Sequence, residues 1–171
     1  MDLTSKYDKF KKIKSIVENH RDASKIDDSV GFCDRKYVNE AINFLSRKSL
    51  SEKELKYKLK RKFGDFDFDP VIHRLKRLNF LNDNELAQSE LKKMSERKFY
   101  SNSKIKSHMN FKGLEPESLE FPENEKERAL NLLKKKYKTK SEKNKNRACR
   151  LLFSYGYSSN IVRECIDEYF R

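Results

Sequence analysis

The stretch 41-AINFLSRKSLSEKELKYKLKRKFG-64 predicts two helices joined by a capped turn. Ser51 and Glu54 form a capping box, in which the hydroxyl accepts a free backbone N–H at the helix start and the carboxylate accepts the serine's own N–H. Apolar side chains then recur at helical spacing and give the second helix one buried face: Leu55, Leu59 and Phe63. Gly64 stands where a left-handed residue would end this helix.

A third helix is expected directly after this pair. Asp69 is placed to cap it, and Pro70 suits its first position because no N–H donor is needed there. Its apolar stripe is formed by Val71, Ile72, Leu75 and Leu78. The stretch therefore extends into a unit of three short amphipathic helices.

We predict that the same unit recurs along the chain, because two independent markers keep similar periods. The helix-ending glycines Gly64, Gly113 and Gly156 are 49 and 43 residues apart. Alanines in the first helices, Ala41, Ala87 and Ala129, are 46 and 42 residues apart. A helical period of about 45 residues is typical of stacked modules that share cores with their neighbours. The alternative is an irregular helical domain whose spacings arise by chance.

We therefore predict an all-α protein of three tandem three-helix modules, stacked into an elongated, curved array. The modules are residues 37–81, 82–124 and 125–171, and residues 1–36 form a partly ordered N-terminal arm. Four glycines and three prolines in 171 residues are too few for the turns of a β-sandwich or barrel. No apolar run approaches the roughly 20 residues of a membrane span. The three cysteines form no CxxC pair, so a reduced, cytoplasmic protein is expected.

Positive charge is distributed unevenly over the predicted modules. Residues 41–81 hold 11 basic and 5 acidic residues, a net charge of +6, and residues 125–171 hold 13 and 6, a net charge of +7. The middle segment, residues 82–124, holds 7 and 8, a net charge of −1. Scattered lysines on a solvated helix face need no partner, but an excess on two modules indicates a polyanion, most plausibly DNA or a protein–DNA assembly.

The search for catalytic and cofactor motifs is negative. No glycine belongs to a GxGxxG or GxxxxGK[ST] pattern, so no phosphate cradle is visible. His20, His73 and His108 lie far apart, without cysteine or carboxylate at metal-ligand spacing. No serine, cysteine or lysine has a recognisable nucleophile setting. We therefore expect a protein that is not an enzyme and that needs no cofactor or metal.

Basic clusters are the best positive signal for a binding site. Four cations are expected on the outward side of the second helix and three more on the third helix: Lys56, Lys60, Arg61 and Lys62, then Arg74, Lys76 and Arg77. Lys134, Lys135 and Lys136 end a later helix, where cations also suit the negative end of the helix dipole. Aromatic residues near the first cluster could stack on bases or pack in the core: Tyr57, Phe66 and Phe68.

Four stretches carry a family resemblance. They read A-x-x-F-L-S-R-x-S-x-S-E-x-E-L-x-x-K-L at residues 41–59, L-x-x-L-N-F-L-N-D-x-x-L-A at 75–87, S-K-I-K-S-H-M-N-F-K-G-L at 103–114 and R-x-x-R-L-L-F-S-Y-G-Y-x-x-x-I-V at 147–162. Their order resembles that of the RecX family, whose members regulate the bacterial RecA recombinase. The resemblance covers roughly residues 41–170.

The resemblance implies a monomeric, non-enzymatic protein of three tandem three-helix modules that lies in the groove of the RecA–DNA filament. There it would lower strand exchange, ATP hydrolysis and coprotease activity, and so modulate homologous recombination and the SOS response. Its partners would be the RecA filament and single- and double-stranded DNA. An alternative of another class is a sequence-tolerant helical DNA-binding protein without a recombinase partner, which would bind bare DNA tightly and with strong salt dependence.

Overall fold

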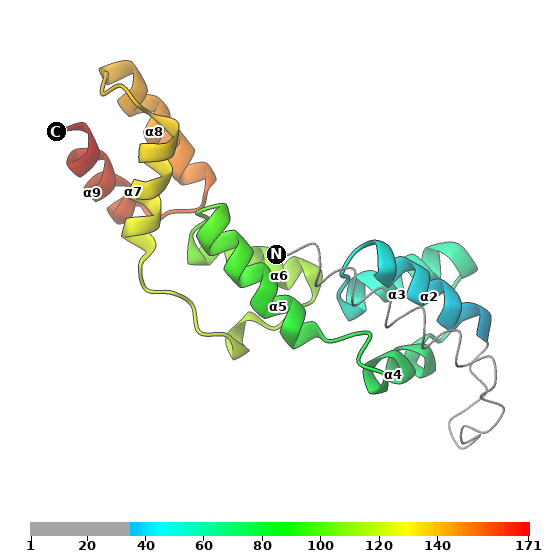
Figure 1. The fold of residues 1–171 in the computed structure, drawn as a ribbon. Coiled ribbons are helices and arrows are strands. Elements are labelled where there is room, and N and C mark those ends of the chain that lie inside the picture. The colour runs from blue at the N-terminus through cyan, green and yellow to red at the C-terminus, as the bar shows by residue number, and fades with distance from the viewer. Residues whose placement is uncertain (1–34) are drawn as a thin grey trace. The chain divides into compact units, whose positions relative to one another are not determined.

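The computed structural model of the chain describes residues 35–171, and they are all-α, as predicted (Figure 1). The predicted N-terminal arm, apart from its last two residues, lies outside the described residues, as do His20 and Cys33. No strand occurs in the part described. The helical elements are α2 (Arg35–Arg47), α3 (Glu52–Phe63), α4 (Asp69–Arg77), α5 (Asp83–Lys92), η1 (Lys93–Arg97), α6 (Asn102–Lys112), η2 (Pro116–Ser118), α7 (Glu125–Lys136), α8 (Glu142–Ser154) and α9 (Ser159–Phe170).

The described chain divides into two compact units. The first unit contains residues 35–50 and 55–81, and the second contains residues 51–54 and 82–171. The first turn of α3 therefore belongs to the second unit, although the rest of that helix belongs to the first. The division into three modules and their stacking into a curved array stay predictions.

One apolar core holds the first unit together. Side chains from α2, α3 and α4 form it, and all are almost completely buried: Val38, Ala41, Leu55, Leu59, Phe68, Val71, Ile72 and Leu75. Tyr37 adds an aromatic contact, since its ring packs edge-on against Phe63 at 4.9 Å and against Phe68 at 5.5 Å between centroids. Each helix therefore buries one stripe of apolar side chains, as the helical periodicity of these residues predicts.

Two apolar clusters occupy the second unit. One gathers the side chains of α5, η1 and α6 around Ile105 and Met109, which are completely buried. The other gathers α7, α8 and α9 around Leu133, Leu152 and Cys165. Burial raises the pKa of the Cys165 thiol to about 11, so it stays protonated and acts as a small apolar group.

Most predicted helix ends are confirmed at the level of hydrogen bonds. Ser51 accepts the N–H of Glu54 at 3.2 Å, and the Glu54 carboxylate accepts the N–H of Ser51 at 3.1 Å, which completes the capping box. Two further helices have a single side-chain cap: Asn82 accepts the N–H of Glu85 at the start of α5, and Ser141 accepts that of Asn144 at the start of α8. All three helix-ending glycines adopt the left-handed conformation.

Two local predictions are wrong. Asp69 does not cap α4: the helix begins at Asp69 itself, the capping position is Phe68, and the Asp67 carboxylate accepts the Asp69 N–H at 2.9 Å. The middle segment has no full third helix either, only the short 3-10 turn η2. Pro122 removes a donor and biases the residue before it to extended geometry, so a helix begun at Pro116 has too few residues to propagate.

A π-helical turn, η1, continues α5 and was not predicted. The wider turn places both Met94 and Ser95 in the interior, where the Ser95 hydroxyl donates to the carbonyl of Leu91 at 2.8 Å. Within residues 35–171, no helix combines the length and the apolar character that crossing a membrane would require.

Candidate nucleic-acid interface

Three of the four predicted cations on α3 are already paired with carboxylates. Lys56 contacts Asp69, Lys60 contacts Asp65 and Lys62 contacts Glu40, each at 2.6 Å. The hydrogen bond from Lys62 lowers the pKa of Glu40, and the hydrogen bond from Lys60 lowers the pKa of Asp65. Much of the positive charge predicted for this helix is therefore neutralised at short range.

These cations also do not share one side of the helix. The partner of Lys56 is the first residue of α4 and that of Lys60 lies in the loop after α3, whereas the partner of Lys62 lies on α2. Arg61 is exposed and makes no ion pair with another residue in the range 35–171. The structure thus separates the α3 cations that the sequence analysis grouped together.

On α4, Arg77 is exposed and Arg74 is half-buried. Neither forms an ion pair with any side chain in the described part of the chain. Of the predicted stacking aromatics, Phe68 is only 2% exposed and belongs to the core, while Tyr57 and Phe66 are well exposed. Of the basic residues predicted for binding in the first unit, Arg61, Arg74 and Arg77 are therefore the ones that form no ion pair with another described residue.

A hollow of about 480 Å³ lies between α3 and α4. Its lining contains Lys56 and Lys60 of α3, four residues of the connecting loop and the first residue of α4: Asp65, Phe66, Asp67, Phe68 and Asp69. Because its two lysines pair with two of its three aspartates, the hollow has no excess positive charge with which to attract a phosphate.

Positive charge is in excess at the end of α7 and along α8. Residues 134–150 contain nine lysines and arginines and one acidic residue, Glu142. The predicted Lys134, Lys135 and Lys136 are all exposed. None of the nine cations pairs with a carboxylate belonging to a described residue. Lys135 and Lys140 instead lie 5.5 Å from the ring of Phe99 and 5.8 Å from that of Tyr169.

Three cations that were not predicted continue this surface along α8. Lys143, Arg147 and Arg150 are exposed and follow one another at spacings of four and three, so they lie on one side of the helix. Ala148 and Leu152 are buried against α7 and α9. The spacing was visible in the sequence, but Arg147 and Arg150 were noted only as part of a family motif and Lys143 was not singled out. We call Lys143, Arg147 and Arg150 the α8 basic stripe.

Acidic residues of the same helical group lie elsewhere. Glu164 and Glu168 on α9 contact Lys126 at 3.3 and 3.1 Å. The hydrogen bonds from Glu168 and Glu164 raise the pKa of Lys126. Lys126 stands in the first turn of α7, at the end away from Lys134, Lys135 and Lys136. The acids of α9 therefore leave the basic end of α7 uncompensated.

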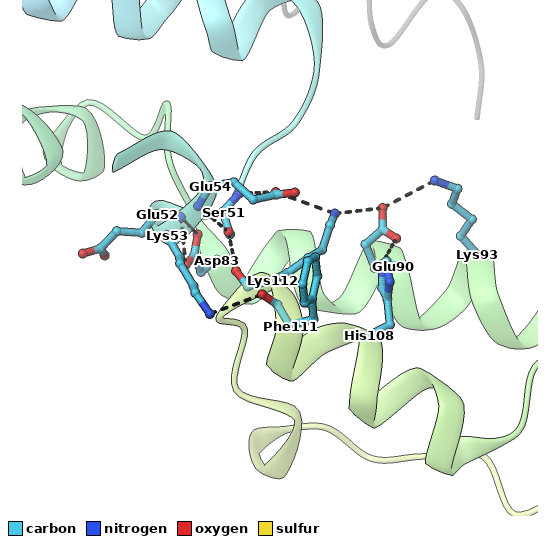
Figure 2. A network of polar contacts seen from close by, with 10 residues as sticks. All are labelled: Ser51, Glu52, Lys53, Glu54, Asp83, Glu90, Lys93, His108, Phe111 and Lys112. Atoms are coloured by element: carbon cyan, nitrogen blue, oxygen red, sulfur yellow. Dashed lines mark hydrogen bonds and ion pairs between the residues drawn. The ribbon is translucent and has the colours of Figure 1, made fainter. Parts of the chain in front are cut away.

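A separate polar network surrounds Lys112, as Figure 2 shows. The Lys112 side chain is only 7% exposed, and its ammonium lies 3.8 Å from the Glu54 carboxylate and 3.7 Å from that of Glu90. His108 and Lys93 each approach Glu90 at 3.4 Å. Burial raises the pKa of Glu90, but the neighbouring Lys112, Lys93 and His108 outweigh it and lower the pKa overall.

The same network fixes the first turn of α3. The Ser51 hydroxyl donates to the Lys112 carbonyl at 2.5 Å, and the Asp83 carboxylate accepts the Glu52 N–H at 3.1 Å. Every polar group named here has a partner within the network, so we interpret the network as a structural feature and not as a binding site. No group of three or more histidine, cysteine or carboxylate side chains in residues 35–171 is arranged to hold a metal ion.

Comparison with known proteins gives two matches. A family model described as "RecX, first three-helix domain" matches residues 38–75. The crystal structure of RecX from Lactobacillus salivarius is similar to this chain with a TM-score of 0.62 and 26% sequence identity, over 78% of this chain and 94% of the other. No curated protein sequence matches. The sequence match and the structural match, one local and one over most of the chain, show that this chain belongs to the RecX family.

Proposed function

We propose that this protein is a non-enzymatic regulator of the RecA recombinase. It binds the filament that the recombinase forms on DNA and mainly inhibits strand exchange, ATP hydrolysis and coprotease activity. It acts as a cytoplasmic monomer without a cofactor. The proposal is supported by family membership and by one structural observation, the uncompensated positive surface formed by the end of α7, residues 137–141 and α8.

Electrostatics explains why this surface suits a nucleoprotein filament. Nine cations against one carboxylate in residues 134–150 create a positive field that attracts phosphates and speeds association. Exposed lysines and arginines that are not held by internal carboxylates can exchange their water and counterions for phosphate contacts. The α8 basic stripe and Lys134, Lys135 and Lys136 are therefore the proposed DNA contacts of the second unit.

The first unit contributes differently in this proposal. Lys56, Lys60 and Lys62 stabilise its own helices through Asp69, Asp65 and Glu40, so we assign them no dominant DNA contact. Three predicted residues that form no ion pair with another described residue stay candidates for contact with DNA or recombinase: Arg61, Arg77 and the half-buried Arg74.

The test is a titration of DNA-stimulated ATP hydrolysis by RecA with the wild-type chain and two double variants. Arg147→Gln/Arg150→Gln removes two charges from the α8 basic stripe. Lys92→Gln/Arg97→Gln removes two exposed charges from α5 and η1, in the near-neutral segment. The wild type and the second variant should inhibit alike, and the first variant should need a several-fold higher concentration. Absence of inhibition by the wild type at several-fold excess over RecA would refute the proposed function.

A DNA-binding protein without a recombinase partner is the second candidate, because the same surface would suit bare DNA. About six phosphate contacts would then reduce the affinity for bare duplex about a thousandfold between 50 and 200 mM salt. Tight, salt-sensitive binding to bare DNA together with no additional affinity for the RecA filament would favour this candidate. Weak binding to bare DNA and strong binding to the filament would favour the regulator.

A further inference from the structure

Phe153 is a large apolar side chain that does not belong to the core of α7, α8 and α9. It lies in the last turn of α8 and is 52% exposed, whereas its neighbour Leu152 is completely buried. The residues that pack against the core of α7, α8 and α9 include Leu151 and Tyr155 but not Phe153. A single exposed phenylalanine is common on protein surfaces, so its exposure alone means little.

Phe153 lies next to the exposed cations of α8. It follows Arg150 by three residues, so the two side chains are neighbours on the helix surface. With the α8 basic stripe it forms a track from Lys143 to Phe153, ten residues or about 15 Å of helix. The only carboxylate on α8 is Glu142, in the first turn, at the far end from Phe153.

We propose that Phe153 stacks on a base of single-stranded DNA whose phosphates are held by the α8 basic stripe. The inference rests on the proposed function in taking DNA as the ligand, and it extends that function by naming the strand form and the residue that selects it. An aromatic face next to a row of cations is how proteins bind single strands without reading sequence. In a duplex the faces of the bases are covered by their neighbours, so Phe153 has nothing to stack on.

Phe111 provides an internal comparison. It is 81% exposed on α6, more than Phe153, but it lies in a segment with a net charge of −1. The residues three and four positions before it are His108 and Ser107, and the following Lys112 is buried between two carboxylates (Figure 2). One exposed cation is near, since Lys53 donates to the Phe111 carbonyl at 3.3 Å, but His108 stands where Phe153 has Arg150. Phe111 therefore serves as the control, with an exposed ring but without the α8 basic stripe.

The experiment uses the absence of tryptophan from the sequence. Phe153→Trp and Phe111→Trp each introduce one fluorophore into the full chain. Each variant is titrated with a single-stranded oligo(dA), a wholly abasic strand of equal length and a duplex, at constant salt. Stacking predicts quenching in the F153W chain by oligo(dA) alone, and little change in the F111W chain. Equal quenching of F153W by the abasic strand or the duplex, or none by oligo(dA), overturns the inference.

A second set of variants measures affinity by fluorescence anisotropy of labelled DNA. Phe153→Leu keeps an apolar side chain but removes the aromatic face, and should weaken binding to oligo(dA) by about 5- to 100-fold. It should leave affinity for the abasic strand within about twofold, while Phe153→Tyr should bind oligo(dA) like the wild type. Equal affinities of F153L and wild type for oligo(dA) overturn the inference. Inhibition of RecA ATPase is measured separately, so failure of stacking and failure of the regulator proposal are distinguishable.

Discussion

Gly156 and Gly64 have nearly the same backbone conformation but very different surroundings. Gly64 has φ +87°, and a Cβ added to it would meet no atom within 4 Å. Gly156 has φ +85°, and an added Cβ would lie 2.6 Å from Ser101 Oγ and 2.8 Å from Lys104 Cβ. Comparing alanine at the two sites therefore separates the strain of the left-handed conformation from the effect of close packing.

The expected magnitudes follow from these contacts. The left-handed conformation destabilises alanine by about 1 to 2 kcal/mol, which is the whole expected effect of Gly64→Ala. At Gly156, overpacking adds about 1 to 3 kcal/mol. Displacing Ser101, whose hydroxyl accepts the Lys104 N–H at 3.1 Å and caps α6, adds about 1 kcal/mol more. Gly156→Ala should therefore lower the free energy of unfolding by about 3 to 6 kcal/mol.

Urea denaturation followed by circular dichroism measures both variants, and hydrogen exchange locates the effect. Exchange at the α6 amides should accelerate in Gly156→Ala and stay unchanged in Gly64→Ala, because Ser101 begins that helix. Adding Ser101→Ala to Gly156→Ala removes one clashing atom, so the double variant should lose less stability than the two single losses together. Losses at Gly156 and Gly64 that agree within about 0.5 kcal/mol would refute the reasoning.

Three further predictions concern the polar groups of the second unit. Lys112→Met leaves Glu90 without its buried counter-ion and should lower the free energy of unfolding by about 2 to 4 kcal/mol in urea denaturation, and adding Glu90→Gln should recover part of the loss. The lowered pKa of Glu90 means that its stabilising charge is present above its ordinary value of 4.5 and is lost as the pH falls through the lower value of the folded state. The stability difference between wild type and Glu90→Gln, from urea midpoints, should accordingly shrink below pH 4.5, and a difference that grows would contradict this assignment. Tyr157→Phe removes the hydroxyl that donates to the Phe99 carbonyl at 2.5 Å and should lower the unfolding free energy by about 1 to 2 kcal/mol, whereas Tyr57→Phe on the surface should cause no measurable change.

Features that depend on neighbouring residues could be predicted from the sequence. The capping box at Ser51 and Glu54 needs only residues three positions apart, and the left-handed glycines need only their own lack of a side chain. The apolar stripes of α3 and α4 follow from the helical period in the same way. Local geometry determines these features, so the local sequence contains the information.

The predicted binding residues depended on contacts between distant residues. Nothing in the sequence says that Lys62 reaches Glu40, or that Lys56 reaches Asp69, because those pairs form only when α2, α3 and α4 pack together. Counting charges therefore overestimated the free positive charge of the first unit. The α8 basic stripe is a different kind of omission, since its spacing was readable once residues 142–154 were recognised as one helix.

The middle segment shows how one residue can change the length of a predicted helix. Pro122 shortens the expected third helix to the turn η2, and the π-helical η1 lengthens the element before it. Neither change disturbs the core around Ile105 and Met109, which stay fully buried. A family pattern thus predicts which helices form a core more reliably than it predicts their lengths.

The central claim is that the basic surface of α7 and α8 binds this protein to the RecA–DNA filament. Co-sedimentation with RecA assembled on single-stranded DNA in a non-hydrolysable ATP analogue tests it most directly. We expect wild type and Lys92→Gln/Arg97→Gln to pellet with the filament, and Arg147→Gln/Arg150→Gln to stay largely in the supernatant at the same salt. Equal pelleting of both double variants, or no pelleting of the wild type, would contradict it.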